Sequence, residues 1–149
     1  MNQDKKKICY VTSCGGHLTE ILEYCQKISK YQYFFVINQN KDISYLNKKF
    51  YVVGHSTFDL KFFLVLYQAY KIIKKEKPQL IVSTGASLAV QFFLVAKIFK
   101  IPTLFIESFT RIHSLSKTGK IVRFLTKNFY VQTSTLKKKY NFKMLEPYI

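Results

Sequence analysis

The sequence predicts an α/β domain, a Rossmann-like doubly wound parallel sheet of about six strands. Short apolar runs alternate with segments of helical periodicity along nearly the whole chain. The apolar runs lack the alternation of half-exposed strands, as expected for a sheet that is covered on both faces. Small-residue turns follow two of these runs, and such turns connect strands to helices in this fold class.

The first half of the chain supplies three predicted strands, at residues 7–12, 33–37 and 50–53. After the first strand, apolar residues recur at spacings of three and four, the stripe of an amphipathic helix. They are Leu18, Ile21, Leu22, Cys25 and Ile28. A polar connection over residues 38–49 leads into the third strand.

The second half adds the longest helix and three more strands. An S-x-x-D pattern at residues 56–59 predicts a helix start, and Pro78 ends the helix that follows. This helix is apolar nearly all round, but it is shorter than the roughly 20 apolar residues that a membrane span needs. Further strands are predicted at 79–83, 103–106 and 129–132, and further helices at 88–99, 118–126 and 136–140.

Length and composition favour one folded domain over residues 1–149, with residues 133–149 as a candidate partner-contacting tail. Domains commonly contain about 100–200 residues. The chain is 48% hydrophobic and 17% aromatic, which excludes a disordered protein.

The charge is strongly basic, with 24 Lys and Arg against 8 Asp and Glu, a net charge of +16. Such a surface attracts polyanions. Arg occurs only at 111 and 123, and Lys suits diffuse attraction better than the bidentate recognition that Arg provides. We therefore favour an anionic membrane surface. A nucleic-acid-binding α/β module is the alternative, but the basic residues are scattered and the aromatic residues lie in apolar runs, so no nucleic acid is expected.

Three cysteines without C-x-x-C spacing indicate neither a disulfide framework nor a zinc site, which fits a reducing cytoplasm. His55 and His113 have no partners at metal-ligand spacing, so no metal site is expected. The polar residues 1–7 resemble neither a signal peptide nor a membrane anchor. We expect a peripheral protein on the cytoplasmic face of the cell membrane.

The turn after the first strand is the first candidate site, with Ser13, Gly15 and Gly16 followed by His17 at the helix start. The free N–H groups of a helix start bind anions, and this position holds phosphate in many such folds. A G-x-G-x-x-G fingerprint is absent, so a dinucleotide is not expected. A simple tight connection between strand and helix is an equally good explanation.

Two further polar segments follow strand ends. Thr84 and Gly85 come after the fourth predicted strand, next to the first in the usual order, although TGAS also serves as an ordinary helix cap. Glu107, Ser108 and Arg111 open a long polar loop after the fifth strand. Glu107 is a candidate catalytic or sugar-binding group and Arg111 a candidate phosphate ligand. The alternative is a Glu–Arg pair that holds the loop.

The long helix is the candidate membrane contact. Its apolar side would enter the lipid while lysines meet anionic headgroups. The residues concerned are Phe58, Phe62, Phe63, Leu66, Lys74 and Lys75. A helix buried between the sheet and a partner explains the pattern equally well.

Three segments resemble a known family: SCGGHLTE (13–20), STGAS (83–87) and IESFTRIHSLSKTGKIVRFLTKNFYVQ (106–132). They resemble the accessory subunit of the two-part UDP-N-acetylglucosamine transferase that acts on dolichol-linked oligosaccharide. They are still more similar to its bacterial counterparts in capsule and exopolysaccharide synthesis. The most specific part is the E-S-x-x-R-x-x-x-L-S-x-x-G-K string that starts at Glu107.

The resemblance implies a split GT-B glycosyltransferase. This chain would be the amino-terminal, acceptor-side half at the membrane, and a separate catalytic subunit would bind the UDP-sugar, so this chain binds no cofactor itself. The expected reaction is inverting transfer of GlcNAc, glucose or galactose to a polyprenyl-pyrophosphate-linked saccharide. Gly15, Gly16 and His17 would face the acceptor pyrophosphate and sugar.

Two residues are candidates for the general base. His17 is a candidate general base or pyrophosphate contact, and Glu107 competes for the role of base. Arg111 would neutralise phosphate, and Thr84 and Gly85 would shape the crevice. A membrane recruiter without chemistry of its own is the remaining alternative.

Overall fold

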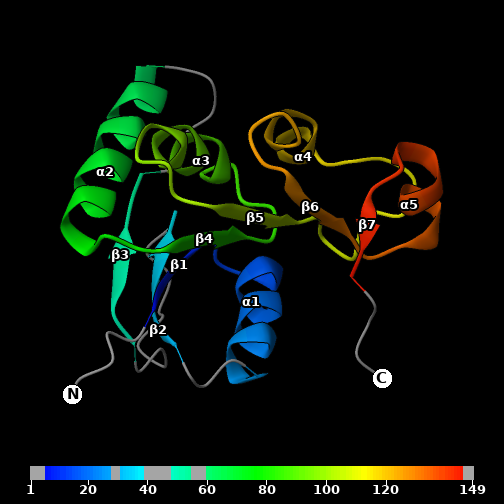
Figure 1. The fold of residues 1–149 in the computed structure, drawn as a ribbon, viewed down its shortest axis with the longest axis horizontal. Coiled ribbons are helices and arrows are strands. Elements are labelled where there is room, and N and C mark those ends of the chain that lie inside the picture. Colours follow the sequence, from blue (N-terminus) through cyan, green and yellow to red (C-terminus); the bar gives the residue numbers. More distant parts are fainter. Residues whose placement is uncertain (1–5, 28–30, 39–47, 55–59, 146–149) are drawn as a thin grey trace.

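A seven-stranded parallel sheet forms the centre of the computed structural model, which describes residues 6–27, 31–38, 48–54 and 60–145 (Figure 1). The strand order is β3-β2-β1-β4-β5-β6-β7, and every neighbouring pair is parallel. The strands are β1 (Lys7–Thr12), β2 (Gln32–Ile37), β3 (Phe50–Val52), β4 (Leu80–Ser83), β5 (Thr103–Ile106), β6 (Asn128–Val131) and β7 (Lys143–Met144). The predicted parallel α/β fold is confirmed.

The structure adds one strand to the predicted six. β7 lies within the predicted tail and pairs with β6, where Tyr130 faces Lys143. A strand of two residues leaves no apolar run in the sequence, so pattern analysis missed it. Residues 143–144 therefore extend the sheet rather than lying free of it.

The helices cover both faces of the sheet. α2 (Leu60–Glu76), α3 (Ala89–Ile98) and α4 (Lys117–Val122) lie on one face, while α1 (Gly16–Lys27) lies on the other (Figure 1). α5 (Ser134–Tyr140) packs beside β6 and β7. The predicted start of the long helix at residues 56–59 falls outside the described residues.

Strand β1 shows why its sequence lacks alternation. Cys9 and Val11 belong to the apolar cluster beneath α2 and α3, whereas Ile8 and Tyr10 belong to the cluster beneath α1. All four side chains are buried. A strand that contributes to two cores has no solvent face, so both sets of alternate residues are apolar.

The strand order places a topological switch point between β1 and β4. From β1 the chain adds β2 and β3 on one side, and it then returns to add β4 and the later strands on the other. Ligands bind at such points, outside the carboxyl ends of the strands. The turns that follow β1 and β4 therefore lie at the expected site.

An ion-pair network ties the opposite, amino edge of the sheet together. The buried carboxylate of Glu76, at the end of α2, lies 3.3 Å from Lys7 Nζ and 2.6 Å from Lys49 Nζ. The Tyr51 hydroxyl also donates to it. Burial raises the pKa of Glu76, but the hydrogen bonds from Lys49, Tyr51 and Lys7 outweigh burial and lower the pKa to about 2.

Candidate functional site

The two predicted small-residue turns are in direct contact. The Thr84 hydroxyl donates a hydrogen bond of 3.1 Å to the carbonyl oxygen of His17. The His17 ring packs on the backbone of Gly85, where an added Cβ would stand 2.8 Å from Cε1 of the ring. Gly85 also has φ of +130°, which L side chains rarely adopt. The turn after β4 is therefore shaped to receive His17.

The surroundings of His17 favour its neutral form. Burial lowers its pKa below the ordinary value, and the positive charge of Arg111 lowers it further, while the nearby carbonyl of Thr84 offsets part of this shift. Its Nδ1 atom is buried, and no group in the described part of the chain makes a well-directed hydrogen bond to it. An imidazole in this state can accept a proton near neutral pH.

Glu107, the other predicted catalytic residue, is directed into the protein. It is 0% exposed, and its carboxylate accepts hydrogen bonds from Ser108 N (3.2 Å), Ser116 N (3.0 Å) and Ser116 Oγ (3.1 Å). Gly119 leaves room for this carboxylate, because a Cβ there would overlap Oε2. Ser116 Oγ accepts from Gly119 N and caps α4.

In this structure Glu107 holds the loop between β5 and α4, and its role as a reacting group stays a prediction. The alternative Glu–Arg pair is not formed, since among the described residues Glu107 forms no ion pair and Arg111 is exposed. Burial is the largest influence on the Glu107 pKa and raises it, although the three hydrogen bonds act in the opposite direction. Its carboxylate therefore faces the protein and not the groove beside His17.

The remaining predicted pyrophosphate ligands lie around the same edge of the sheet. Gly15 and Gly16 are exposed at the start of α1, and Ser13 is half-buried. Ser108 is buried, and its hydroxyl lies 3.2 Å from that of Thr110. Within the described ranges, no group of three or more His, Cys, Asp and Glu side chains could hold a metal ion.

A groove of about 580 Å³ opens beside His17, between α1 and the loop after β5. Seven of its ten lining residues were not predicted as site residues, among them Glu20, Tyr24, Phe109 and Gln132. Glu20 and Tyr24 follow His17 at positions +3 and +7 of α1, so helical spacing could have placed them on the same face. Gln132 lies more than a hundred residues further on, and no local pattern connects it to α1.

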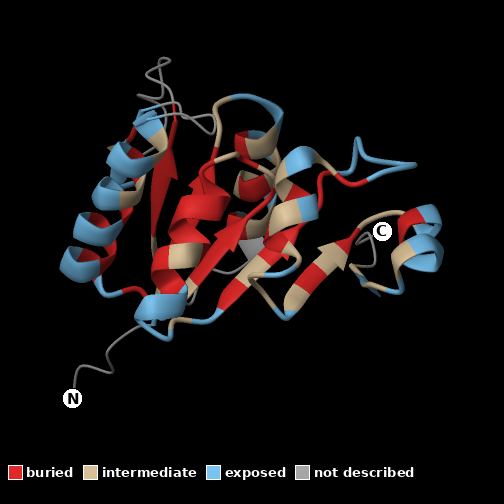
Figure 2. Ribbon diagram, turned by 90° about the horizontal axis from the view of Figure 1, so that it is seen from above, coloured by how far each residue is buried: buried red, intermediate tan, exposed pale blue. Residues whose placement is uncertain are grey.

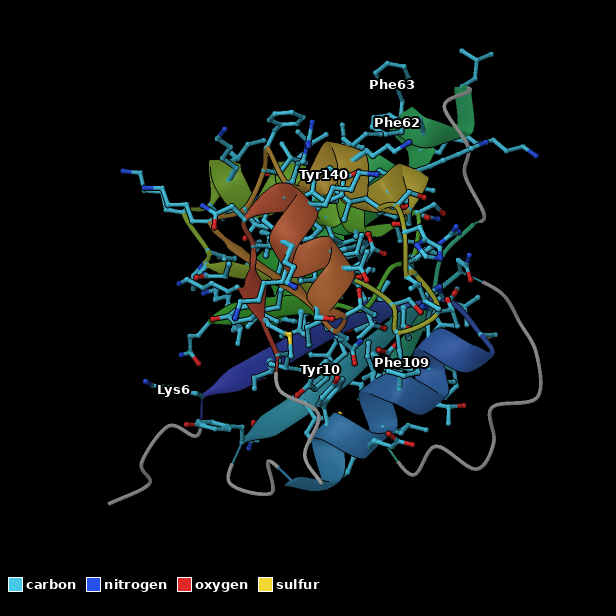
Figure 3. The ribbon with its side chains drawn as sticks, turned by 90° about the vertical axis from the view of Figure 1, so that its right-hand side faces the viewer. Lys6, Tyr10, Phe62, Phe63, Phe109 and Tyr140 are labelled. Atoms are coloured by element: carbon cyan, nitrogen blue, oxygen red, sulfur yellow. The ribbon has the colours of Figure 1, made fainter. Side chains whose placement is uncertain are left out.

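The predicted membrane helix is α2, which has one apolar stripe that faces the core and a second that faces solvent. Leu60, Phe63, Leu64 and Tyr67 are exposed, whereas Val65, Ala69, Ile72 and Ile73 face the core. Figure 2 shows this division along α2, and in Figure 3 Phe63 projects outward.

Of the predicted lipid contacts on α2, Phe63, Lys74 and Lys75 are exposed, while Phe62 and Leu66 are half-buried against the core. Phe58 lies outside the described residues. No described helix combines the length and the apolar character that crossing a membrane requires.

The fold is of the class found in the amino-terminal halves of GT-B glycosyltransferases and of UDP-GlcNAc 2-epimerases. MurG of Acinetobacter baumannii superposes with a TM-score of 0.75 at 16% identity, over 87% of this chain and 42% of that protein. UDP-GlcNAc 2-epimerase of Methanocaldococcus jannaschii superposes with a TM-score of 0.71 at 16% identity, over 89% of this chain and 41% of that one. At these identities the similarity establishes the fold.

The family follows from the sequence. Residues 53–146 match the family described as "Oligosaccharide biosynthesis protein Alg14 like", and the chain belongs to this family. The mouse protein "UDP-N-acetylglucosamine transferase subunit ALG14" is 31% identical over 84 residues, which cover 52% of this chain and 39% of the mouse protein. The human protein of the same name is 24% identical, over 93% of this chain and 80% of its own length.

Proposed function

We propose that this chain is the acceptor-side subunit of a heteromeric, UDP-sugar-dependent glycosyltransferase that acts at a membrane surface in polysaccharide biosynthesis. A separate catalytic subunit binds the UDP-sugar, and this chain binds a polyprenyl-pyrophosphate-linked saccharide. The observation that carries the proposal is the contact between His17 and Gly85 at the switch point of a chain that belongs to the Alg14-like family.

The share of each solved relative that aligns with this chain supports two separate subunits, one for the acceptor and one for the UDP-sugar. It aligns with about two-fifths of each solved relative, which is one half of a two-domain architecture. Two curated relatives carry the word "subunit" in their names. On this proposal, the catalytic subunit completes the site between the two halves.

The chemistry at the switch point suits a lipid-linked diphosphate. The exposed N–H groups of Gly15 and Gly16 lie at the amino end of α1, where the helix dipole favours negative charge. Arg111 adds a positive charge whose influence reaches His17. Neutral His17 then serves as general base for the acceptor hydroxyl, because the Glu107 carboxylate already accepts hydrogen bonds from Ser108 and Ser116.

The membrane side of the proposal rests on α2. This helix begins at the carboxyl edge of the sheet, since it follows β3 and the strands are parallel. The most exposed apolar residues of α2, from Leu60 to Tyr67, lie in its first two turns, and exposed lysines, including Lys71, Lys74 and Lys75, follow. The apolar end and the switch point therefore share one edge of the molecule, so that a lipid-linked acceptor reaches the crevice from the bilayer.

The test begins with the complex. The full chain is purified from its host membranes, co-purifying proteins are identified, and the resulting pair is assayed with UDP-GlcNAc, UDP-glucose and UDP-galactose on polyprenyl-pyrophosphate-linked saccharides in vesicles. We expect transfer by the pair and little by either polypeptide alone. The variant His17→Ala lowers kcat by about 10²-fold or more, the usual contribution of a general base, while the pair still assembles.

Two results would overturn the proposal. One is tight binding of UDP-sugar by this chain alone. The other is undiminished transfer by an assembled pair that carries His17→Ala.

A further inference from the structure

We infer that Glu20 binds hydroxyl groups of the acceptor saccharide, with Gln132 as the residue that positions its carboxylate and Phe109 as an apolar platform opposite. This inference rests on the proposed function and names the part of the acceptor that the groove beside His17 holds.

Gln132 links the two walls of the groove. Its Nε2 donates to Glu20 Oε1 on α1 and, over 2.9 Å, to the carbonyl oxygen of Glu107 at the end of β5. Its Oε1 accepts a hydrogen bond of 3.3 Å from the Tyr24 hydroxyl. Both N–H groups of the amide are therefore used within the protein, so Gln132 orients Glu20 and leaves ligand binding to the carboxylate.

The Glu20 carboxylate, held by Gln132, lines the groove. Its side chain is half-buried and lies one helical turn beyond His17. Glu107, by contrast, is fully buried and faces Ser116. Of these two buried or half-buried carboxylates near the switch point, Glu20 is the one that a ligand can reach.

The charge of the groove selects the ligand. The chain carries a net charge of +16, yet the groove is lined by Glu20 and Glu23 and by no Lys or Arg. A phosphate group would be repelled next to these two carboxylates, so the acceptor diphosphate lies at the helix start formed by Gly15 and Gly16 and not against Glu20. The neutral saccharide next to the diphosphate does fit.

The chemistry of the lining suits a sugar ring. An ionised carboxylate accepts strong hydrogen bonds from hydroxyl groups. Across the groove, Phe109 is 64% exposed and lies beside α1 (Figure 3). An exposed aromatic ring offers an apolar face to the C–H groups of a pyranose. Carboxylate and ring together bind one edge and one face of the saccharide.

The first experiment measures kinetics in the reconstituted pair. Glu20→Gln keeps the size of the side chain and removes its charge. We expect an increase in KM for the lipid-linked acceptor of about tenfold or more, the cost of losing a charged hydrogen bond, with KM for the UDP-sugar unchanged. Gln132→Leu raises the acceptor KM in the same direction. Lys127→Gln is the control: it removes a charge from an exposed position before the amino end of β6, outside the groove, and should change KM less than about twofold.

A deoxy series of acceptors separates binding from a merely structural role. An acceptor that lacks the hydroxyl bound by Glu20 is used poorly by the wild-type pair, and Glu20→Gln adds no further loss with it. If Glu20 only stabilised the fold, the variant would weaken every acceptor equally and lower the melting temperature. That outcome would overturn the inference. If Glu20→Gln does not fold, Glu20→Asp, which keeps the charge and shortens the side chain, takes its place in the same assays.

The second experiment does not depend on transfer. Saturation-transfer NMR of the full chain with the methyl glycosides of GlcNAc, glucose and galactose should give a signal that Glu20→Gln and Phe109→Ala remove and that Lys127→Gln, outside the groove, keeps. Such a signal without transfer from any UDP-sugar would refute the proposed function and leave the saccharide site standing. If Glu20→Gln binds the glycosides and uses the acceptor as the wild type does, or if no glycoside binds and no transfer occurs, the inference is wrong.

Discussion

The imidazole of His17 lies against the backbone of Gly85, and only a glycine at position 85 permits this contact. A Cβ there would stand 2.8 Å from Cε1 of the ring, at a backbone φ of +130°. The contact joins the turns after two neighbouring strands, β1 and β4. The position of the proposed base is therefore set by a residue 68 positions further along the chain (85 − 17).

Gly85→Ala should displace the His17 ring and strain the turn. We expect a loss of stability of roughly 1–3 kcal/mol, the usual cost of an unfavourable backbone conformation, together with a fall in kcat of the reconstituted pair. Gly54→Ala is the control, since nothing lies within 4 Å of a Cβ built at Gly54 and its φ is not in the positive range. Thermal unfolding and transferase assays measure both effects. Equal stability and activity of the two variants would contradict the assignment.

Glu107→Ala should loosen the loop between β5 and α4. The substitution leaves buried donors of Ser108 and Ser116 without their acceptor, at a cost of roughly 1–3 kcal/mol in unfolding free energy. Ser116→Ala, which removes the cap of α4, should cost about 1 kcal/mol. Glu23→Ala, at an exposed site, should stay within about 0.5 kcal/mol of wild type.

The pH dependence of kcat/KM distinguishes the two roles of Glu107. A residue that only holds the loop can be changed to Gln without altering the shape of the profile. Loss of the acidic limb in Glu107→Gln would restore this residue as the base.

The exposed stripe of α2 should carry membrane binding. Phe63→Ser removes a side chain that is 67% exposed, and we expect weaker binding to vesicles that contain anionic lipid, because apolar area and lysines act together at such a surface. Phe124→Ser is matched in chemistry and exposure, at 72%, but lies beyond the end of α4 near the amino edge of the sheet. Vesicle co-sedimentation measures both variants. An equal loss for both would point to nonspecific adhesion.

Glu76 should make the fold sensitive to acid. Its pKa is lowered to about 2 in the folded chain, below the value near 4.5 of an unperturbed glutamate, so its contribution to stability is complete above pH 4.5. That contribution is lost as the pH falls from about 4.5 towards 2. Glu76→Gln should therefore be less stable at pH 7 and lose less stability on acidification. Denaturant unfolding between pH 7 and pH 3 measures this, and a wild-type slope in the variant would refute it.

The predicted parallel fold is confirmed because its signals are local. Apolar runs such as residues 7–12 form strands wherever both faces of a sheet are covered, and the turns that follow them need small residues within a few positions. The same local signals predict His17 and Gly85 at the ends of neighbouring strands.

The missed features depend on contacts between distant residues. Gln132 donates a hydrogen bond to Glu20, a residue 112 positions earlier in the chain. The Glu107 carboxylate has room because Gly119 lacks a side chain. Whether a carboxylate reaches a ligand or serves the fold depends on which donors surround it, and those donors come from other elements. The sequence by itself determined the parallel fold and the edge of the sheet that holds the site. Only the tertiary structure decided that Glu107 points inward and that Glu20 lines the groove.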